Sequence, residues 1–252
     1  MQIVVDSLLV SYDEAGGKNK QVMLCLHGWG DDRRTFAGLT AAFKADYNVI
    51  ALDLPGFGTS QAPPDVWGLE EYAHFVAKFL KKLGISEVDT LVAHSNGAAV
   101  AIVAIAAGQL APKHFVILGG AGIRDQEKAK KLGLKAVAKV GKTMTFWLPA
   151  SKKKSLQKKL YGAAGSDMLA VPHLQETFKK TVSQDVQADA RKIDVPTLLI
   201  YGESDRATPP MYGEIYQRLI PNSQLQVIAD AEHFVHHDQA AKVHTLIKEF
   251  LA

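Results

Sequence analysis

The chain has very little cysteine and no long apolar run. Cys25 is the single cysteine of the 252 residues, so no disulfide forms within the chain. It lies in the apolar segment Val22 to Leu26, which predicts an unreactive thiol in the core. The longest apolar run, Ala98 to Ala107, is shorter than the roughly 20 residues of a transmembrane helix. The start, Met1 to Asp6, lacks the basic residues and long apolar stretch of a signal peptide, so we expect a cytoplasmic protein without a membrane span.

The chain as a whole also lacks a large excess of either positive or negative charge. Lys and Arg number 29 and Asp and Glu 26, for a formal net charge of +3. This weak balance and an otherwise ordinary composition predict a globular protein without a nucleic-acid partner. The sequence shows no internal repeat or low-complexity segment. We expect no metal site among the nine histidines and no cofactor.

Strand and helix signals alternate along most of the chain. The first strand signal, Ile3 to Tyr12, predicts one or two short antiparallel strands, and a turn is expected over Asp13 to Lys20. Further strands are expected at 21–26, 48–54, 90–93, 114–118, 197–201 and 225–228. Helices are expected at 35–44, 68–83, 98–107, 211–220 and 239–251. Strands separated by helices predict a mostly parallel sheet covered on both faces.

Ser95 lies in a tight connection between a predicted strand and a predicted helix. The local sequence is Ala93-His94-Ser95-Asn96-Gly97, with small residues two positions before and after the serine. Small residues let strand and helix approach closely at a strained turn that holds the hydroxyl outward, as a nucleophile requires. A serine that caps the following helix explains the pentapeptide equally well.

Asp205 and His233 each follow a predicted strand directly. Because chemistry in parallel sheets gathers beyond the carboxyl ends of the strands, both are expected at the same edge as Ser95. The order serine, acid, histidine is that of an α/β-hydrolase triad. His233 would take the Ser95 proton, and Asp205 would orient the imidazole and stabilise its charged form. Asp205 is preferred because Pro209 places it in a loop before a helix.

Several neighbouring residues are alternatives for these roles. Glu203 and Asp230 lie near the same strand ends as Asp205. His236 and His237 replace His233 only if the turn after the last strand is longer, and we expect them to open the last helix beside Asp238 instead. For His27 and His94 we expect hydrogen bonds that orient loops rather than general-base chemistry.

The segment His27-Gly28-Trp29-Gly30 follows the first buried strand. Glycines there let the backbone turn so that an amide hydrogen points at a reacting carbonyl oxygen. We therefore predict an oxyanion hole made of the backbone N–H groups of Trp29 and Asn96. The alternative is a plain glycine turn.

Taken together, these motifs resemble those of the α/β-hydrolase superfamily, over nearly the whole chain. The resemblance adds the segment Asp53 to Ser60 (DLPGFGTS), which in relatives is a structural loop near the site. Relatives that are haloalkane dehalogenases or epoxide hydrolases use an aspartate nucleophile, which Ser95 argues against. The segments HGWG and LPGFG also resemble pimeloyl-acyl-carrier-protein methyl ester esterases, although the elbow around Ser95, with alanine in place of the first glycine, departs from theirs.

Between Gly122 and Ile193 the alternation of strand and helix breaks down. We expect residues 1–122 and 193–252 to form the α/β-hydrolase core and 123–192 to form a helical, lysine-rich cap inserted over the site. This segment holds 16 Lys or Arg against 6 Asp or Glu. Its charge fits either a solvated lysine-rich surface or a field that attracts an anionic substrate, an acidic carrier protein or a membrane surface. Apolar cap residues are expected to line a substrate pocket, namely Phe146, Trp147, Leu148, Tyr161, Met168, Leu169 and Phe178.

The function expected from these residues is that of a serine hydrolase of the carboxylesterase type. Ser95 would attack a small-molecule ester, with an anionic or carrier-bound ester as one option, and water activated by His233 would release the acid from the acyl-enzyme. One alternative is hydrolysis of a carbon–carbon bond in a ring-cleavage dienoate by the same triad. A second alternative is a ligand-binding protein of the same fold with little turnover. The oligomeric state is left open.

Overall fold

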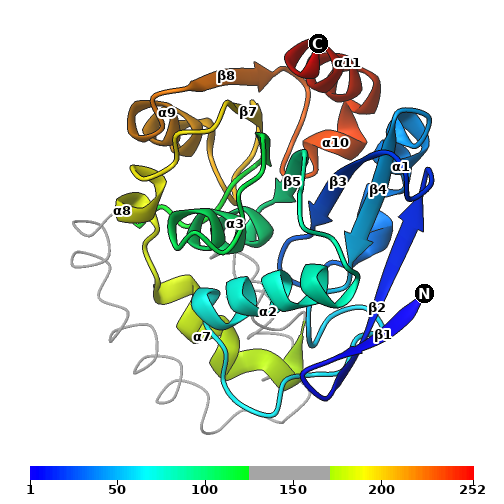
Figure 1. Cartoon of the computed structure of the whole chain (residues 1–252). Helices are drawn as coiled ribbons and strands as arrows, with labels where there is room; N and C mark the ends of the chain where they lie inside the picture. Colours follow the sequence, from blue (N-terminus) through cyan, green and yellow to red (C-terminus); the bar gives the residue numbers. More distant parts are fainter. Residues whose placement is uncertain (125–170) are drawn as a thin grey trace, which may run out of the picture.

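A computed structural model describes residues 1–124 and 171–252, which form an eight-stranded sheet between layers of helices (Figure 1). The strands are β1 (Gln2–Val5), β2 (Leu8–Ala15), β3 (Gln21–Leu26), β4 (Tyr47–Leu52), β5 (Thr90–His94), β6 (His114–Leu118), β7 (Thr197–Gly202) and β8 (Ser223–Ile228). Their order in the sheet is β1-β2-β4-β3-β5-β6-β7-β8. Strands β1 and β2 pair antiparallel, β2 meets β4 antiparallel, and every other pair is parallel. The predicted mostly parallel α/β sheet is confirmed.

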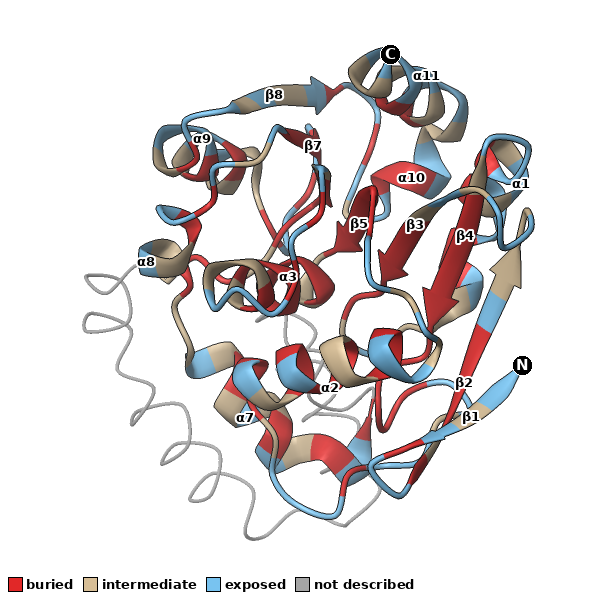
Figure 2. Cartoon of the chain, viewed as in Figure 1, coloured by how far each residue is buried: buried red, intermediate tan, exposed pale blue. Residues whose placement is uncertain are grey.

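Helices cover both faces of the sheet. They are η1 (Arg33–Phe36), α1 (Ala37–Phe43), α2 (Leu69–Lys82), α3 (Asn96–Ala106), η3 (Pro172–Leu174), α7 (Gln175–Ser183), α8 (Gln187–Ala190), α9 (Pro210–Leu219), α10 (Val235–Asp238) and α11 (Ala240–Leu251), where η marks a 3₁₀ helix. Buried side chains of α2, α3 and α9 join one core cluster, and those of α1 and α11 join the other. Figure 2 shows the central strands almost entirely buried between these layers.

Alternation along the strands sorts their side chains between the two clusters. In β3, Leu24 and Leu26 join the α2–α3 side, while Met23 and Cys25 join the α1–α11 side. This follows from the two-residue period of a strand that is buried on both faces. Cys25 is fully buried, and burial raises the pKa of its thiol, as expected for an unreactive core cysteine.

Three predictions about elements need correction. The turn expected over Asp13 to Lys20 begins later, because β2 runs on to Ala15 through antiparallel pairing with β4. The helix expected at 35–44 is divided into η1 and α1, and the side chain of Asp32 accepts a hydrogen bond from Arg34 N at the start of η1. His236 and His237 lie in the separate short helix α10 rather than at the start of α11.

The C-terminal part of the expected cap, residues 171–192, contains η3, α7 and α8 and no strand. Residues 125–170 lie outside the described part of the chain, so the cap boundaries stay a prediction. Across 1–124 and 171–252, no helix is both long enough and apolar enough to cross a membrane.

Candidate active site

Ser95 forms the corner between β5 and α3. Its backbone has a positive φ, at φ 51° and ψ −118°, a conformation that costs a non-glycine residue about 1–3 kcal/mol. Gly97 is required by the same corner, because a Cβ at this position would lie 2.4 Å from the carbonyl oxygen of Leu26. The Ser95 side chain makes no capping hydrogen bond to α3, so the alternative of a helix-capping serine is wrong.

The structure brings Ser95, His233 and Asp205 together as a hydrogen-bonded chain. His233 Nε2 lies 2.9 Å from Ser95 Oγ, and His233 Nδ1 lies 2.8 Å from Asp205 Oδ2. The three residues follow β5, β8 and β7, whose carboxyl ends meet at one edge of the sheet. The acid bonded to the imidazole is therefore Asp205 and neither Glu203 nor Asp230.

Asp205 is held as a buried carboxylate. Its side chain also accepts hydrogen bonds from the backbone N–H groups of Ala207 at 2.8 Å and Thr208 at 2.9 Å. Burial raises the pKa of Asp205. The hydrogen bond and charge of His233, with the hydrogen bonds from Thr208, lower this pKa by more than burial raises it, so the net shift is downward. An ionised Asp205 accepts from Nδ1–H, which leaves Nε2 of neutral His233 free to accept the Ser95 proton.

Thr208 is a part of this site that sequence reasoning missed. Its buried hydroxyl lies 2.8 Å from Asp205 Oδ2, 2.8 Å from the carbonyl oxygen of Gly119 and 3.1 Å from His233 Nδ1. The single hydroxyl proton goes to Asp205 or to Gly119, so Thr208 ties the acid to the end of β6. The only sequence signal was a threonine three residues after the acid, which is a common turn pattern.

The two predicted oxyanion donors lie on either side of the Ser95 corner. Asn96 is the first residue of α3, where a backbone N–H has no partner within the helix. Gly28 packs directly on the corner, since a Cβ there would lie 3.0 Å from Ser95 Cβ, and Trp29 follows it. Neither amide donates a hydrogen bond to any residue within 1–124 or 171–252. As far as the described residues go, both N–H groups are therefore unengaged and can donate to a ligand.

The remaining histidines near the site contact backbone rather than Ser95. His27 Nδ1 donates to Gly28 O at 2.7 Å, and its Nε2 accepts from Leu54 N at 3.0 Å. His94 Nε2 donates to His233 O at 3.1 Å. Burial lowers the pKa of both His27 and His94, and the charges of neighbouring histidines lower that of His94 further. Both orient loops, as the sequence predicted.

His236 and His237, the alternative bases, bond to Thr35 instead. The Nε2 atoms of both rings lie 3.1 Å from Thr35 Oγ1, and His237 Nε2 donates to Thr35 O at 2.8 Å. Burial and the charges of His237 and His233 lower the pKa of His236 to about 3. His236 therefore stays neutral beneath the site.

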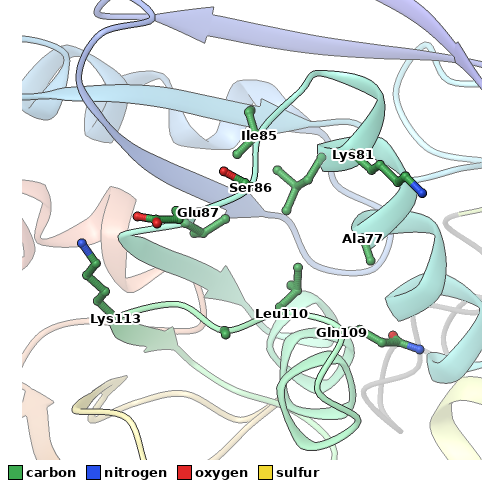
Figure 3. Close-up of a pocket in the computed structure, with 11 residues that line it drawn as sticks. Ala77, Lys81, Ile85, Ser86, Glu87, Gln109, Leu110 and Lys113 are labelled. Carbon is green, nitrogen blue, oxygen red and sulfur yellow. The ribbon is translucent and has the colours of Figure 1, made fainter.

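The predicted pocket residues Phe146, Trp147, Leu148, Tyr161, Met168 and Leu169 lie outside the described part of the chain. Phe178 lies on α7, where its ring packs against Trp29. A cavity of about 390 Å³ lies elsewhere, lined by Lys81, Glu87, Gln109 and Lys113 among others (Figure 3). Because Glu87 and Lys113 precede β5 and β6, this cavity is at the opposite edge of the sheet from Ser95. Within the described residues, no group of three His, Cys, Asp or Glu side chains is placed to hold a metal ion.

The fold and the Ser95 edge define an α/β hydrolase. A family model described as the alpha/beta hydrolase family matches residues 23–246, and the chain belongs to this family. The pimeloyl-[acyl-carrier protein] methyl ester esterase of Neisseria meningitidis serogroup C is 31% identical over 242 residues, which cover 88% of this chain and 90% of that protein.

Solved structures share the fold over the whole chain. An esterase from Thermogutta terrifontis superposes with a TM-score of 0.75 at 22% identity, covering 100% of this chain and 97% of that one. A meta-cleavage product hydrolase from Pseudomonas fluorescens superposes with a TM-score of 0.74 at 21% identity, covering 99% and 96%. These structural similarities confirm the α/β-hydrolase fold, and the Neisseria relative confirms the resemblance to pimeloyl-acyl-carrier-protein methyl ester esterases noted in the sequence.

Proposed function

We propose that the protein is a serine hydrolase that cleaves carboxylic esters through an acyl-enzyme, with Ser95, His233 and Asp205 as its triad. The observation that carries the proposal is the continuous contact from Ser95 Oγ to His233 Nε2 at 2.9 Å and from His233 Nδ1 to Asp205 at 2.8 Å. Nucleophile, base and orienting acid within hydrogen-bond reach are the geometry of nucleophilic acyl transfer.

The reaction proceeds in two halves. Ser95 Oγ attacks the ester carbonyl while its proton passes to His233 Nε2, and the oxyanion accepts hydrogen bonds from the N–H groups of Trp29 and Asn96. His233 returns the proton to the leaving alcohol, which leaves an acyl group on Ser95. A water molecule then gives a proton to His233 and attacks the acyl carbonyl, and His233 returns this proton to Ser95 Oγ as the acid is released.

The substrate class we favour is an ester with an anionic or carrier-bound acyl group. The 31% identical relative is named for a methyl ester carried on an acyl-carrier protein. The charge of segment 123–192, 16 basic against 6 acidic residues, has the sign that such a substrate requires.

Labelling with a fluorophosphonate tests the triad directly. Attack by Ser95 on phosphorus expels fluoride and leaves a stable adduct, which peptide mass spectrometry locates. We expect the adduct on Ser95 in the wild type, much slower labelling in His233→Ala, and normal labelling in the exposed control His74→Ala. A folded wild type that stays unlabelled would instead support a ligand-binding protein without turnover.

A further inference from the structure

The side chain of Trp29 is held by aromatic packing on two sides. Its ring centroid lies 4.9 Å from that of Phe57, at 83° between the planes, and 5.0 Å from that of Phe178, at 57°. Phe57 is buried in the loop after β4, and Phe178 belongs to α7. The indole Nε1 is buried without a hydrogen-bond partner in the described chain. Within the described chain, aromatic packing rather than hydrogen bonding therefore orients the Trp29 side chain.

Helix α7 is fastened firmly to the core beside α2 (Figure 1). The side chain of Gln184, just after α7, accepts a hydrogen bond from Leu69 N at 2.8 Å and so caps the first turn of α2. Lys180 forms an ion pair with Glu71 at 2.7 Å. On the other side, His173 donates to Gly56 O at 3.0 Å, one residue before Phe57. The helix that carries Phe178 is thus joined both to α2 and to the loop that carries Phe57.

The peptide plane that carries the Trp29 N–H is held at its Gly28 end, because Gly28 O accepts hydrogen bonds from His27 Nδ1 at 2.7 Å and from Asp31 N at 3.4 Å. Trp29 lies between Gly28 and Gly30, and Gly30 has a positive φ of 74°. Glycine lets the chain rotate more freely than any other residue, so the position of the Trp29 end of this plane depends also on what the Trp29 side chain contacts. The fixed indole therefore acts together with the hydrogen bonds to Gly28 O in setting the direction of the Trp29 N–H.

We propose that Phe178 is a positioning residue for the oxyanion hole: through its contact with the Trp29 indole, α7 holds the Trp29 N–H in the direction that the reaction needs. This inference rests on the proposed function, because it assigns the Trp29 amide to the oxyanion. It also gives Phe178 a role different from the pocket wall expected from the sequence. A pocket wall acts on substrate binding and so on KM, whereas a mispositioned oxyanion donor acts on kcat.

Phe178→Ala and the milder Phe178→Leu test the inference, with Lys179→Ala as the control on the same helix. Lys179 is exposed and, among the described residues, pairs only with Glu176, so its loss leaves the contact with Trp29 intact. Each variant is assayed for kcat and KM on a 4-nitrophenyl ester and for inhibition by an aryl trifluoromethyl ketone, which forms an oxyanion when Ser95 adds to it.

We expect Phe178→Ala to lower kcat by about 10- to 100-fold with KM within about twofold, and to weaken the ketone by a similar factor. Phe178→Leu should fall between Phe178→Ala and the wild type, and Lys179→Ala should match the wild type. An increase in KM with unchanged kcat, or unchanged kinetics in Phe178→Leu and Phe178→Ala, would overturn the inference. Hydrolysis that persists in Ser95→Ala would instead refute the proposed function, so the two failures are distinguishable.

Discussion

At the scale of single residues, the hydroxyl of Thr208 is one of the groups that hold Asp205 beside His233. It is a buried donor shared between Asp205 Oδ2 and Gly119 O, each at 2.8 Å. Removing it leaves the buried carboxylate with one donor fewer and frees the acid from β6. In the proposed triad the acid acts through the tautomer and direction of His233, so we expect a loss of restraint on Asp205 to affect Ser95.

Thr208→Val, which keeps the shape and removes the hydroxyl, should lower kcat/KM by about tenfold. The pKa of Asp205 should rise, because one of the hydrogen bonds that lowers it is lost. Steady-state kinetics measures the first effect, and an NMR titration of the Asp205 carboxyl carbon measures the second. Thr245→Val, at an exposed position of α11, serves as the control. Equal kcat/KM for Thr208→Val and the wild type would contradict this role.

His236 is a residue whose burial has a cost that depends on pH. Its pKa falls from 6.5 to about 3 on folding, so the unfolded chain binds a proton here more readily than the folded one. The stability that neutral His236 contributes is complete above pH 6.5 and is lost progressively as the pH falls toward 3.

The free energy of unfolding should therefore drop more between pH 8 and pH 5 in the wild type than in His236→Asn, by about 1–2 kcal/mol. Denaturant titrations at the two pH values measure this difference. His74→Asn, at an exposed histidine, should behave like the wild type. A pH dependence in His236→Asn identical to that of the wild type would be evidence against a neutral buried His236.

At the scale of elements, Gln184 joins α7 to α2. Gly68, at the N-cap of α2, has no side chain to accept a hydrogen bond, and Gln184 Oε1 supplies the acceptor for Leu69 N at 2.8 Å. Gln184→Ala should destabilise the fold by about 1 kcal/mol, the usual effect of losing a helix cap. Thermal unfolding monitored by circular dichroism tests this. Gln217→Ala, at an exposed position of α9, should leave the midpoint unchanged.

Most elements of the core could be predicted from the sequence because their signals are local. The strand β6 was expected at 114–118 and lies at His114–Leu118, since a short apolar run between loops has few other solutions. Asp13–Ala15 was misassigned to a turn because its strand conformation comes from pairing with β4, which lies far along the chain. Propensity alone does not reveal such a partner.

Some residues of the candidate site could likewise be predicted from local sequence signals, and others could not. Ser95, Asp205 and His233 could be proposed because each directly follows a strand, and parallel strands end at one edge. Thr208 and Phe178 could not be assigned their contacts, because a threonine in a turn and a phenylalanine on a helix are ordinary residues. Their roles follow only from the three-dimensional contacts of Thr208 with Gly119 and of Phe178 with Trp29.

At the scale of the whole molecule, charge is divided unevenly between the predicted cap and the core. In the described part of the cap, Lys179, Lys180 and Lys192 pair with Glu176, Glu71 and Asp189. Exposed pairs of this kind contribute little to stability and reduce the local field. Any field that attracts an anion must therefore come mainly from the other basic residues of 123–192.

If that field acts on substrate, kcat/KM for an ester with an anionic acyl chain should fall about tenfold between about 0.05 M and about 0.5 M salt. A neutral ester of the same length should change by less than about twofold. Stopped-flow or steady-state assays on the two esters measure the contrast. Equal salt dependence for both esters would mean that the lysine-rich segment is only a solvated surface.

The central claim is that Ser95 is the nucleophile of an esterase. A panel of 4-nitrophenyl esters of increasing acyl chain length, hydrolysed by the wild type and by Ser95→Ala, tests it most directly. We expect turnover by the wild type on at least one ester and a loss of about 10⁴-fold or more in Ser95→Ala, with the fold unchanged by circular dichroism. Hydrolysis that persists at the wild-type rate in folded Ser95→Ala would contradict it.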